Sequence, residues 1–122
     1  METEDNTLTG DLVLPWPPSV NTYWRTFRGR MILSKIGRMY QTAIAEQVVM
    51  QSCPKFGDRK IRVTIAAHRP DKRRRDLDNL LKAALDGMCS AGVFDDDSQI
   101  VDLRIYWAEP IGGLLKVKVE AV

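Results

Sequence analysis

The sequence predicts a two-layer α+β domain, in which a small mixed sheet of four strands carries two helices on one face. Two observations lead to this fold class. Segments with alternating apolar residues and segments with helical periodicity follow one another in the order β-α-β-α-β-β. The chain of 122 residues has the length of one domain, and a domain of this size can bury one core of its own.

The chain begins with an acidic stretch and a short strand. Residues 1–10 are polar and lack periodicity, so we expect a disordered acidic tail followed by one folded domain over residues 11–122. Residues 12–14 form the first predicted strand, and the proline-rich residues 15–18 end it because proline cannot donate to a sheet. Residues 19–30 are expected to form a loop.

Two segments show the periodicity of amphipathic helices. The first is expected over residues 34–51, where Ser34 is a suitable N-cap and apolar residues recur every three or four positions. The second is expected over residues 78–91, and Gly92 is a suitable residue to end it. Each helix therefore has one apolar face to bury against the sheet.

The remaining strands follow from alternation of apolar and polar residues. They are expected at residues 61–68, 100–107 and 115–120. The last two are joined by a short segment that contains Pro110 and Gly112, so we expect them to pair with each other as a hairpin.

The composition argues against zinc and acyl-transfer chemistry. Cys53, Cys89 and His68 are too few for a four-ligand zinc site. The cysteines are expected to be reduced thiols, and His68 a satisfied sheet residue rather than a general base. No apolar segment approaches the ~20 residues that span a bilayer, so we expect a cytoplasmic protein with no membrane partner.

The net charge of +2 is distributed unevenly along the chain. Residues 12–45 contain five basic residues and no acidic one, and residues 68–82 contain six basic and three acidic residues. Two basic patches indicate a localised anionic partner. Within the first, aromatic residues alternate with arginines at residues 23–30. These aromatic residues either stack on exposed bases or cover the edge of the core beside solvated arginines, and both interpretations stay open.

The densest group of candidate functional residues runs from Arg73 to Lys82. If the chain is extended before the second helix, Asp76 and Asp78 point to the same side, ~7 Å apart, where both could bind a hard divalent cation. Lys82 lies one helical turn beyond Asp78, ~6 Å along the axis, and Asp86 continues that face.

Three interpretations of this motif are open from its residues. The first is metal-dependent phosphate chemistry, to which the acidic residues 95–97 could add a third carboxylate. The second is nucleic-acid binding without catalysis. The third is a solvated polar face in which Asp78 caps the helix and pairs with Lys82.

Three blocks of the sequence together resemble the RusA-type Holliday junction resolvases of phages, prophages and bacteria. The first block is LPWPPS at residues 14–19, with Asn21 and Tyr23. The second runs from His68 through PDKRRRDLDNL to KAA at residues 82–84, and the third is DDSQIVD at residues 96–102. The blocks occur in the family's order and spacing over residues 11–120, so their combination is far more specific than any one of them.

The resemblance implies a homodimeric endonuclease that binds branched DNA. Such an enzyme resolves four-way (Holliday) junctions by paired nicks in opposed strands, in DNA recombination and repair. It uses Mg²⁺, for which Mn²⁺ substitutes, and no small-molecule cofactor. The alternatives are a non-catalytic DNA-binding or architectural protein of the same fold, and a nuclease for flaps or plain duplex.

The resemblance also implies roles for particular residues. The catalytic carboxylates and metal ligands fall on Asp76, Asp78 and Asp97, with Asp96 as the alternative loop ligand, and the essential lysine falls on Lys82. The implied DNA-binding residues are Lys72, Arg73, Arg74, Arg75 and Asn79. The chain departs from the family pattern by a third loop aspartate, Asp95, and by a lysine at position 72 where arginine is commoner.

Overall fold

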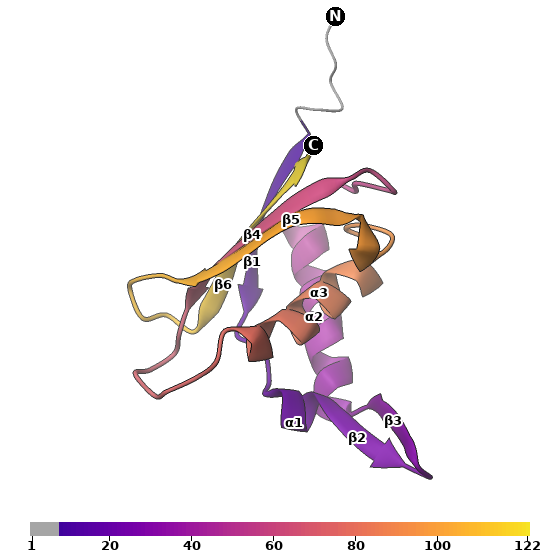
Figure 1. Ribbon diagram of the computed structural model, residues 1–122, viewed down its shortest axis with the longest axis vertical. Coiled ribbons are helices and arrows are strands. Elements are labelled where there is room, and N and C mark those ends of the chain that lie inside the picture. The colour runs from indigo at the N-terminus through magenta and orange to yellow at the C-terminus, as the bar shows by residue number, and fades with distance from the viewer. Residues whose placement is uncertain (1–7) are drawn as a thin grey trace, which may run out of the picture.

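The structure is a computed structural model of the chain, and it describes residues 8–122. Its elements (Figure 1) are β1 Thr9–Pro15, α1 Val20–Tyr23, β2 Trp24–Phe27, β3 Arg30–Leu33, α2 Lys35–Met50, β4 Ile61–His68, α3 Asp78–Ser90, the 3₁₀ turn η2 Asp97–Gln99, β5 Ile100–Trp107 and β6 Leu114–Ala121. The first strand begins at Thr9, two residues before the expected start of the domain. The rest of the expected acidic tail, residues 1–7, lies outside the described residues.

A four-stranded sheet forms one layer, with its strands in the order β1-β6-β4-β5. β6 pairs antiparallel with both β1 and β4, whereas β4 and β5 are parallel. Helices α2 and α3 cover the same face of this sheet (Figure 1), and they also pack against each other. The predicted two-layer α+β fold with a mixed four-stranded sheet is confirmed.

The expected hairpin between the last two strands is wrong, because β4 lies between β5 and β6. β4 buries every second residue from Ile61 to Ala67, and it has a partner strand on each side. Helix α3 crosses over the sheet and brings β5 back parallel to β4, which leaves β6 the opposite side of β4. The connection over residues 108–113 passes the end of β4, where the N–H of Gly112 donates to the carbonyl of Arg69 at 3.0 Å.

Residues 19–30 are more regular than the loop that the sequence predicts. They contain the one-turn helix α1 and most of the hairpin β2–β3. At its tip, Arg28 and Gly29 have φ angles of 52° and 75°, and positive φ at both central residues is characteristic of type I′ hairpin turns. Apolar alternation does not mark these strands, because residues 25–31 are exposed on both faces.

The core is formed by the helices and the inner face of the sheet. Helix α2 buries Tyr40, Ile44 and Val48 at four-residue intervals. The Tyr40 hydroxyl donates to the carbonyl of Pro15 at 2.6 Å, which ties the middle of α2 to the end of β1. On α3, the absence of a side chain at Gly87 leaves room for Ile44. The packing of α2 against α3 fixes the orientation of α3, whose first turn carries Asp78 and which directly follows Asp76.

The start of α2 is packed directly against the base of the hairpin. The Ser34 hydroxyl accepts a hydrogen bond from the N–H of Gly37 at 3.0 Å and contacts the carbonyl oxygens of Thr22 and Tyr23. A Cβ atom at Gly37 would lie 2.5 Å from the Tyr23 carbonyl oxygen and 2.8 Å from the Leu33 side chain. The close approach of backbone to backbone therefore requires glycine at this position.

We expect Gly37→Ala to lower the free energy of unfolding by about 1–3 kcal/mol, because backbone must move to admit the methyl group. Alanine is favoured over glycine inside a helix by about 1 kcal/mol. A net loss of stability in Gly37→Ala would therefore show that the steric clash outweighs this preference. Urea unfolding followed by circular dichroism measures the change. The control is Thr42→Ala at an exposed site in the same helix, which should stay within about 0.7 kcal/mol of the parent. Equal stability of the two variants would contradict the prediction.

Candidate active site

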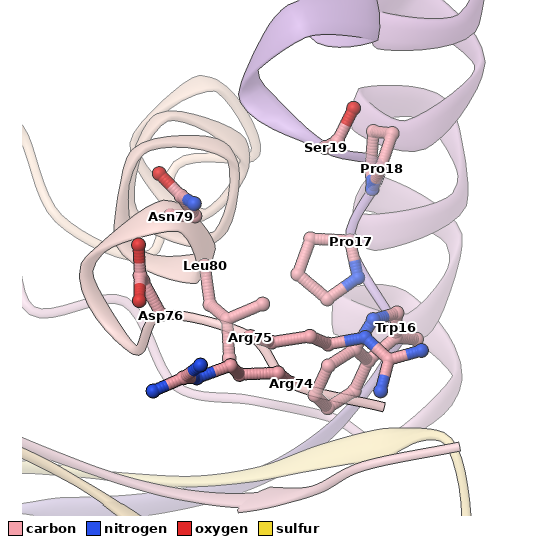
Figure 2. A pocket seen from close by; sticks show the side chains of 9 residues that line it. All are labelled: Trp16, Pro17, Pro18, Ser19, Arg74, Arg75, Asp76, Asn79 and Leu80. Carbon is pink, nitrogen blue, oxygen red and sulfur yellow. The ribbon is translucent and has the colours of Figure 1, made fainter. Parts of the chain in front are cut away.

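A pocket of about 540 Å³ lies where the proline-rich segment after β1 meets the loop before α3 (Figure 2). Its lining residues are Trp16, Pro17, Pro18, Ser19, Arg74, Arg75, Asp76, Asn79 and Leu80. Two of the sequence blocks, whose lining residues are more than fifty positions apart in the chain, thus form opposite walls of one cavity. The pocket combines two guanidinium groups, a carboxylate and an indole ring, which suits an anionic ligand with flat rings.

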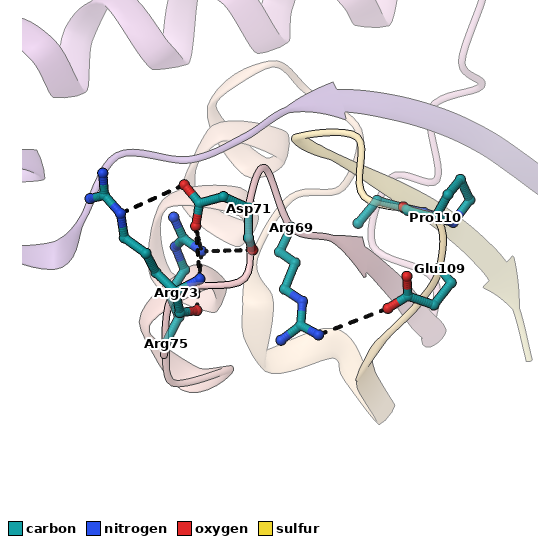
Figure 3. Close-up of polar contacts among 7 residues, drawn as sticks. Arg69, Asp71, Arg73, Arg75, Glu109 and Pro110 are labelled. Atoms are coloured by element: carbon teal, nitrogen blue, oxygen red, sulfur yellow. Dashed lines mark hydrogen bonds and ion pairs between the residues drawn. The ribbon is translucent and has the colours of Figure 1, made fainter.

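The basic loop before α3 is held in place by Asp71 (Figure 3). The Asp71 carboxylate pairs with Arg75 at 2.8 Å and with Arg73 at 3.8 Å. It also accepts the backbone N–H of Arg73 at 2.9 Å. The Arg75 side chain is 22% exposed, whereas that of Arg73 is 83% exposed. Arg75 is therefore positioned by the protein, and Arg73 extends into solvent.

Ring stacking ties the same loop to the edge of the sheet. The Arg75 guanidinium lies 5.8 Å from the Trp16 ring centroid, and the Trp16 and Trp107 rings are stacked at 6.4 Å. Arg69 lies 5.6 Å from the other ring, that of Trp107, and 3.9 Å from the Glu109 carboxylate. The ladder Arg75–Trp16–Trp107–Arg69 connects the loop, the proline-rich segment and β5, and contacts of this kind stabilise both ends of the loop.

The contacts of Asp71 predict an unusual titration. The hydrogen bond from the Arg75 side chain, helped by the one from the Arg73 backbone, lowers the pKa of Asp71 from the ordinary 3.8 to about 2. A lowered pKa adds stability that is present above pH 4 and is lost as the pH falls through about 2. Because the carboxylate is partly solvated, we expect the loss to show as local disorder of the loop rather than as global unfolding.

Carboxyl-carbon NMR resonances should show this titration directly. We expect the midpoint of Asp71 near pH 2 in the parent protein, and a rise towards the ordinary value in Arg75→Gln. Arg74→Gln is the matched control, since Arg74 contributes nothing to the pKa shift of Asp71. An unchanged midpoint in Arg75→Gln would contradict the assigned cause.

Asp76 and Asp78 lie at the start of α3 and have no counter-ion among the described residues. Within residues 8–122, neither side chain makes a hydrogen bond or an ion pair. The first turn of α3 has no side-chain cap, so Asp78 does not serve as one. Nor does it pair with Lys82, whose ammonium contacts Asp86 instead. The interpretation of this motif as a helix cap with an ordinary ion pair therefore does not describe the structure.

Lys82 lies between the ring of Trp24 and the carboxylate of Asp86. Its Nζ atom is 3.7 Å from Asp86 Oδ1 and 5.7 Å from the Trp24 ring centroid. Burial raises the pKa of Asp86, the Lys82 charge opposes that rise, and the nearby Asp97 adds to it. Asp86 is thus a partly buried member of the site that sequence reasoning only noted as continuing the helix face. The four-residue spacing from Lys82 was the signal for this contact.

The aspartates of the acidic loop after α3 differ in the contacts of their side chains. Asp96 accepts the N–H of Ser98 at 2.9 Å and caps η2, and these hydrogen bonds lower its pKa. Gln99 fixes the loop, because its side chain accepts the N–H groups of Asp95 and Asp96 and donates to the carbonyls of Gly57 and Arg59, which lie between α2 and β4. The Asp97 side chain has no such partner among residues 8–122. The geometry favours Asp97 over Asp96 as the side chain available to a ligand.

The structure brings the predicted residues into two neighbouring groups along α3. Asp76 and Asn79 meet the arginines at its start, while Asp97 lies near Asp86, two helical turns beyond Asp78. No three His, Cys, Asp or Glu side chains in the part of the chain that the structure describes are arranged to hold a metal ion. The donor chemistry nevertheless fits a hard divalent cation, since Asp76, Asp78 and Asp97 are exposed carboxylates without protein partners. Metal binding by these three residues stays a prediction.

The remaining predicted residues lie in different environments. Lys72 and Arg74 are exposed, and no described residue forms an ion pair with them. His68 is buried in β4, where its Nδ1 atom lies 2.9 Å from the carbonyl oxygen of Pro110, as expected for a structural residue. Cys53 and Cys89 are free thiols. No helix within residues 8–122 combines the length and apolar character needed to cross a membrane.

The fold and the site together define the class. An α+β domain that presents a fixed basic loop beside unpaired carboxylates has the features of an enzyme acting on phosphodiesters. Residues 15–120 match the family model described as endodeoxyribonuclease RusA. The chain therefore belongs to the RusA family of endodeoxyribonucleases.

Relatives with assigned names agree with the family model. The chain is 43% identical over 98 residues to the crossover junction endodeoxyribonuclease RusA of Escherichia coli strain K12, a match that covers 80% of this chain and 81% of the relative. It is 38% identical over 108 residues to the crossover junction endodeoxyribonuclease of Enterobacteria phage HK97, covering 88% and 90% of the two chains. The corresponding protein of Enterobacteria phage 82 is 43% identical over 98 residues.

Proposed function

We propose that this protein is a divalent-metal-dependent endodeoxyribonuclease that resolves four-way DNA junctions by paired nicks in opposed strands, in DNA recombination and repair. The observation that carries the proposal is the pair of carboxylates, Asp76 and Asp78, which have no ion-pair partner within residues 8–122 and lie at a pocket lined by Arg74 and Arg75. A protein that only binds DNA would gain nothing from acidic side chains beside a phosphate. The names of the relatives supply the substrate class.

The basic loop is proposed to hold the DNA backbone. Lys72, Arg73 and Arg74 are exposed and accessible to phosphates, while Arg75 is pre-positioned by Asp71 and Trp16. Asn79 lines the same pocket and can donate to a phosphate or sugar oxygen. Because phosphate contacts release counterions, affinity for the junction should fall steeply with rising salt concentration.

Three carboxylates are proposed to hold the metal. Asp76, Asp78 and Asp97 would bind Mg²⁺, with Mn²⁺ as a substitute, and Asp96 is the alternative to Asp97. A bound ion of this kind lowers the pKa of water and stabilises negative charge on phosphoryl oxygens. Lys82 is proposed to place its ammonium near the scissile phosphate, and Asp86 and Trp24 hold that ammonium in position.

Symmetry supports a homodimer. A four-way junction has approximate two-fold symmetry, so a C₂ dimer would present two equivalent sites to two equivalent strands. A monomer would leave one strand uncut after each encounter. Light scattering of the protein with and without junction DNA would test the stoichiometry. The relatives come from E. coli and from phages, which supports a setting in the bacterial cytoplasm.

Cleavage of three matched substrates tests the proposed function. A synthetic four-way junction, a flap and a linear duplex of the same sequences are incubated with equal amounts of protein in Mg²⁺, and chelation by EDTA serves as control. We expect cuts in two opposed strands of the junction and little cutting of the duplex. Equal cutting of all three substrates would indicate a general nuclease. Junction binding without cutting in Mg²⁺ or Mn²⁺ would indicate the non-catalytic DNA-binding alternative.

A further inference from the structure

The hairpin β2–β3 projects from the helical layer, away from the four-stranded sheet (Figure 1). Within residues 8–122, its two strands pair with each other and with no other strand. All residues from 25 to 31 are exposed. The core therefore does not need the tip of this hairpin, and its surface chemistry calls for a separate explanation.

The tip combines an aromatic ring with guanidinium groups. Phe27 is 48% exposed, and the guanidinium groups of Arg25 and Arg28 lie 5.4 Å and 5.2 Å from its ring centroid. Arg30 is the cross-strand partner of Phe27. No acidic residue occurs between residues 12 and 45, so these charges have no local counter-ions in the sequence. A flat apolar ring surrounded by cations matches the two parts of a nucleic-acid strand, its bases and its phosphates.

The base of the hairpin is rigid and lies beside the candidate active site. Tyr23 and Trp24 contact each other edge to face at 5.1 Å, and the Trp24 ring faces Lys82 at 5.7 Å. The backbone N–H of Ser34 donates to the carbonyl of Tyr23 at 3.0 Å, and the Arg38 side chain donates to the carbonyl of Leu33 at 3.0 Å. The hairpin is thus an arm that is fixed beside Lys82, the proposed catalytic lysine, and exposed at its tip.

We propose that this arm binds the branch point of the DNA, with Phe27 stacked on a base and with Arg25, Arg28 and Arg30 on the adjacent phosphates. The inference rests on the proposed function for its substrate. In continuous duplex both faces of each base are covered by neighbouring bases, so a protein ring finds a free face only where stacking is interrupted. The branch point of a junction is such a place.

The length of the arm sets the position of the stacked base. Phe27 lies three positions beyond Trp24 in the strand, which corresponds to ~10 Å. Successive phosphates of one strand are spaced ~3.4 Å along a helix axis, so the arm spans about three nucleotides. The base that Phe27 contacts should therefore lie within about three nucleotides of the phosphate near Lys82.

The first test compares Phe27→Ala with Met31→Ala, a change at another exposed apolar residue of the same hairpin. Binding is measured without divalent metal, by fluorescence anisotropy, to a synthetic four-way junction and to a duplex of equal length. We expect Phe27→Ala to weaken junction binding about tenfold, the usual loss for one stacked base, and to leave duplex binding within about twofold. Met31→Ala should leave both unchanged, and Phe27→Tyr, which keeps a flat ring, should retain the preference for the junction.

A fluorescent base reports the contact itself. With 2-aminopurine at the branch point, the parent protein should change its emission, and Phe27→Ala should abolish most of that change. Replacing Arg25, Arg28 and Arg30 together by glutamine should lower the slope of log affinity against log salt by about 2.7, since three phosphate contacts are lost. Thermal melting confirms that each variant is folded.

The outcomes separate this inference from the proposed function, because binding is measured without cleavage. If the parent protein cuts junctions but Phe27→Ala keeps the parent's preference and 2-aminopurine signal, the arm assignment is overturned and the proposed function stands. If the parent protein binds junctions through Phe27 but does not cut them, the proposed function fails and the arm assignment stands. Loss of signal in Met31→Ala as large as in Phe27→Ala would also overturn the specific role of Phe27.

Discussion

Asp76→Asn is expected to lower the rate of junction cleavage by at least about 10²-fold in Mg²⁺, while junction affinity stays within about threefold. The change removes the negative charge of a proposed metal ligand and keeps the size of the side chain. Asp76 makes no ion pair within residues 8–122, so its loss should leave the fold intact. Removing a carboxylate beside the basic loop can even strengthen DNA binding, because repulsion of the phosphates falls.

Single-turnover cleavage and anisotropy binding, measured on the same junction, separate the two effects. Calorimetric titration with Mn²⁺ gives a further readout that does not depend on activity, and it should show weakened metal binding in Asp76→Asn. The matched control is Asp11→Asn, the same chemical change at an exposed residue of β1 on the side of the sheet away from the helices. Cleavage by Asp76→Asn at the parent rate would refute the assignment of this residue.

Phe94→Ala is expected to produce the largest loss of stability, about 3–5 kcal/mol in the free energy of unfolding. The Phe94 side chain is fully buried where the chain leaves α3 for the acidic loop. Truncation removes its apolar contacts and leaves a cavity. Because small domains are stable by only about 5–15 kcal/mol, a loss of this size should lower the melting temperature by ten degrees or more.

Urea unfolding of Phe94→Ala and Phe27→Ala provides the comparison. Both variants lose the same atoms, but Phe27 is 48% exposed and should change the stability by less than about 1 kcal/mol. Similar losses in the two variants would show that the hairpin tip packs in solution more tightly than its exposure indicates. A stable Phe94→Ala would show that the segment before Asp97 repacks without Phe94.

The parts of the fold that could be predicted from sequence are those determined by local signals. Helix α2 follows from its N-cap at Ser34 and the apolar repeat behind it, and α3 from its repeat and Gly92. Strand pairing is not local, which is why the prediction that β5 and β6 form a hairpin was wrong. The buried central position of β4 depends on the crossover of α3, and neighbours in the sequence carry no sign of it. The hairpin β2–β3 was missed because residues 25–31, which make up most of it, are exposed on both faces.

For the candidate site, too, features set by local sequence could be predicted, whereas contacts between distant residues could not. The acidic residues before and at the start of α3 could be located from the sequence, because their spacing is short and the helix start is marked. The partner of Lys82 could not be chosen between Asp78 and Asp86 on spacing alone, since both lie four residues away. The structural role of Asp96 emerged only from the hydrogen bond to Ser98. Contacts of this kind depend on where the loop lies in space.

The stacked ladder that joins Arg75, Trp16, Trp107 and Arg69 has a consequence for the thermodynamics of binding. A flexible basic loop would lose conformational entropy when it settles on DNA, at about 0.5–1.5 kcal/mol for each long side chain that becomes immobile. In this protein part of that ordering takes place on folding, because the rings of Trp16 and Trp107 hold the loop against the edge of the sheet. Binding should therefore cost less conformational entropy at Arg75 than at Arg73, whose side chain is 83% exposed.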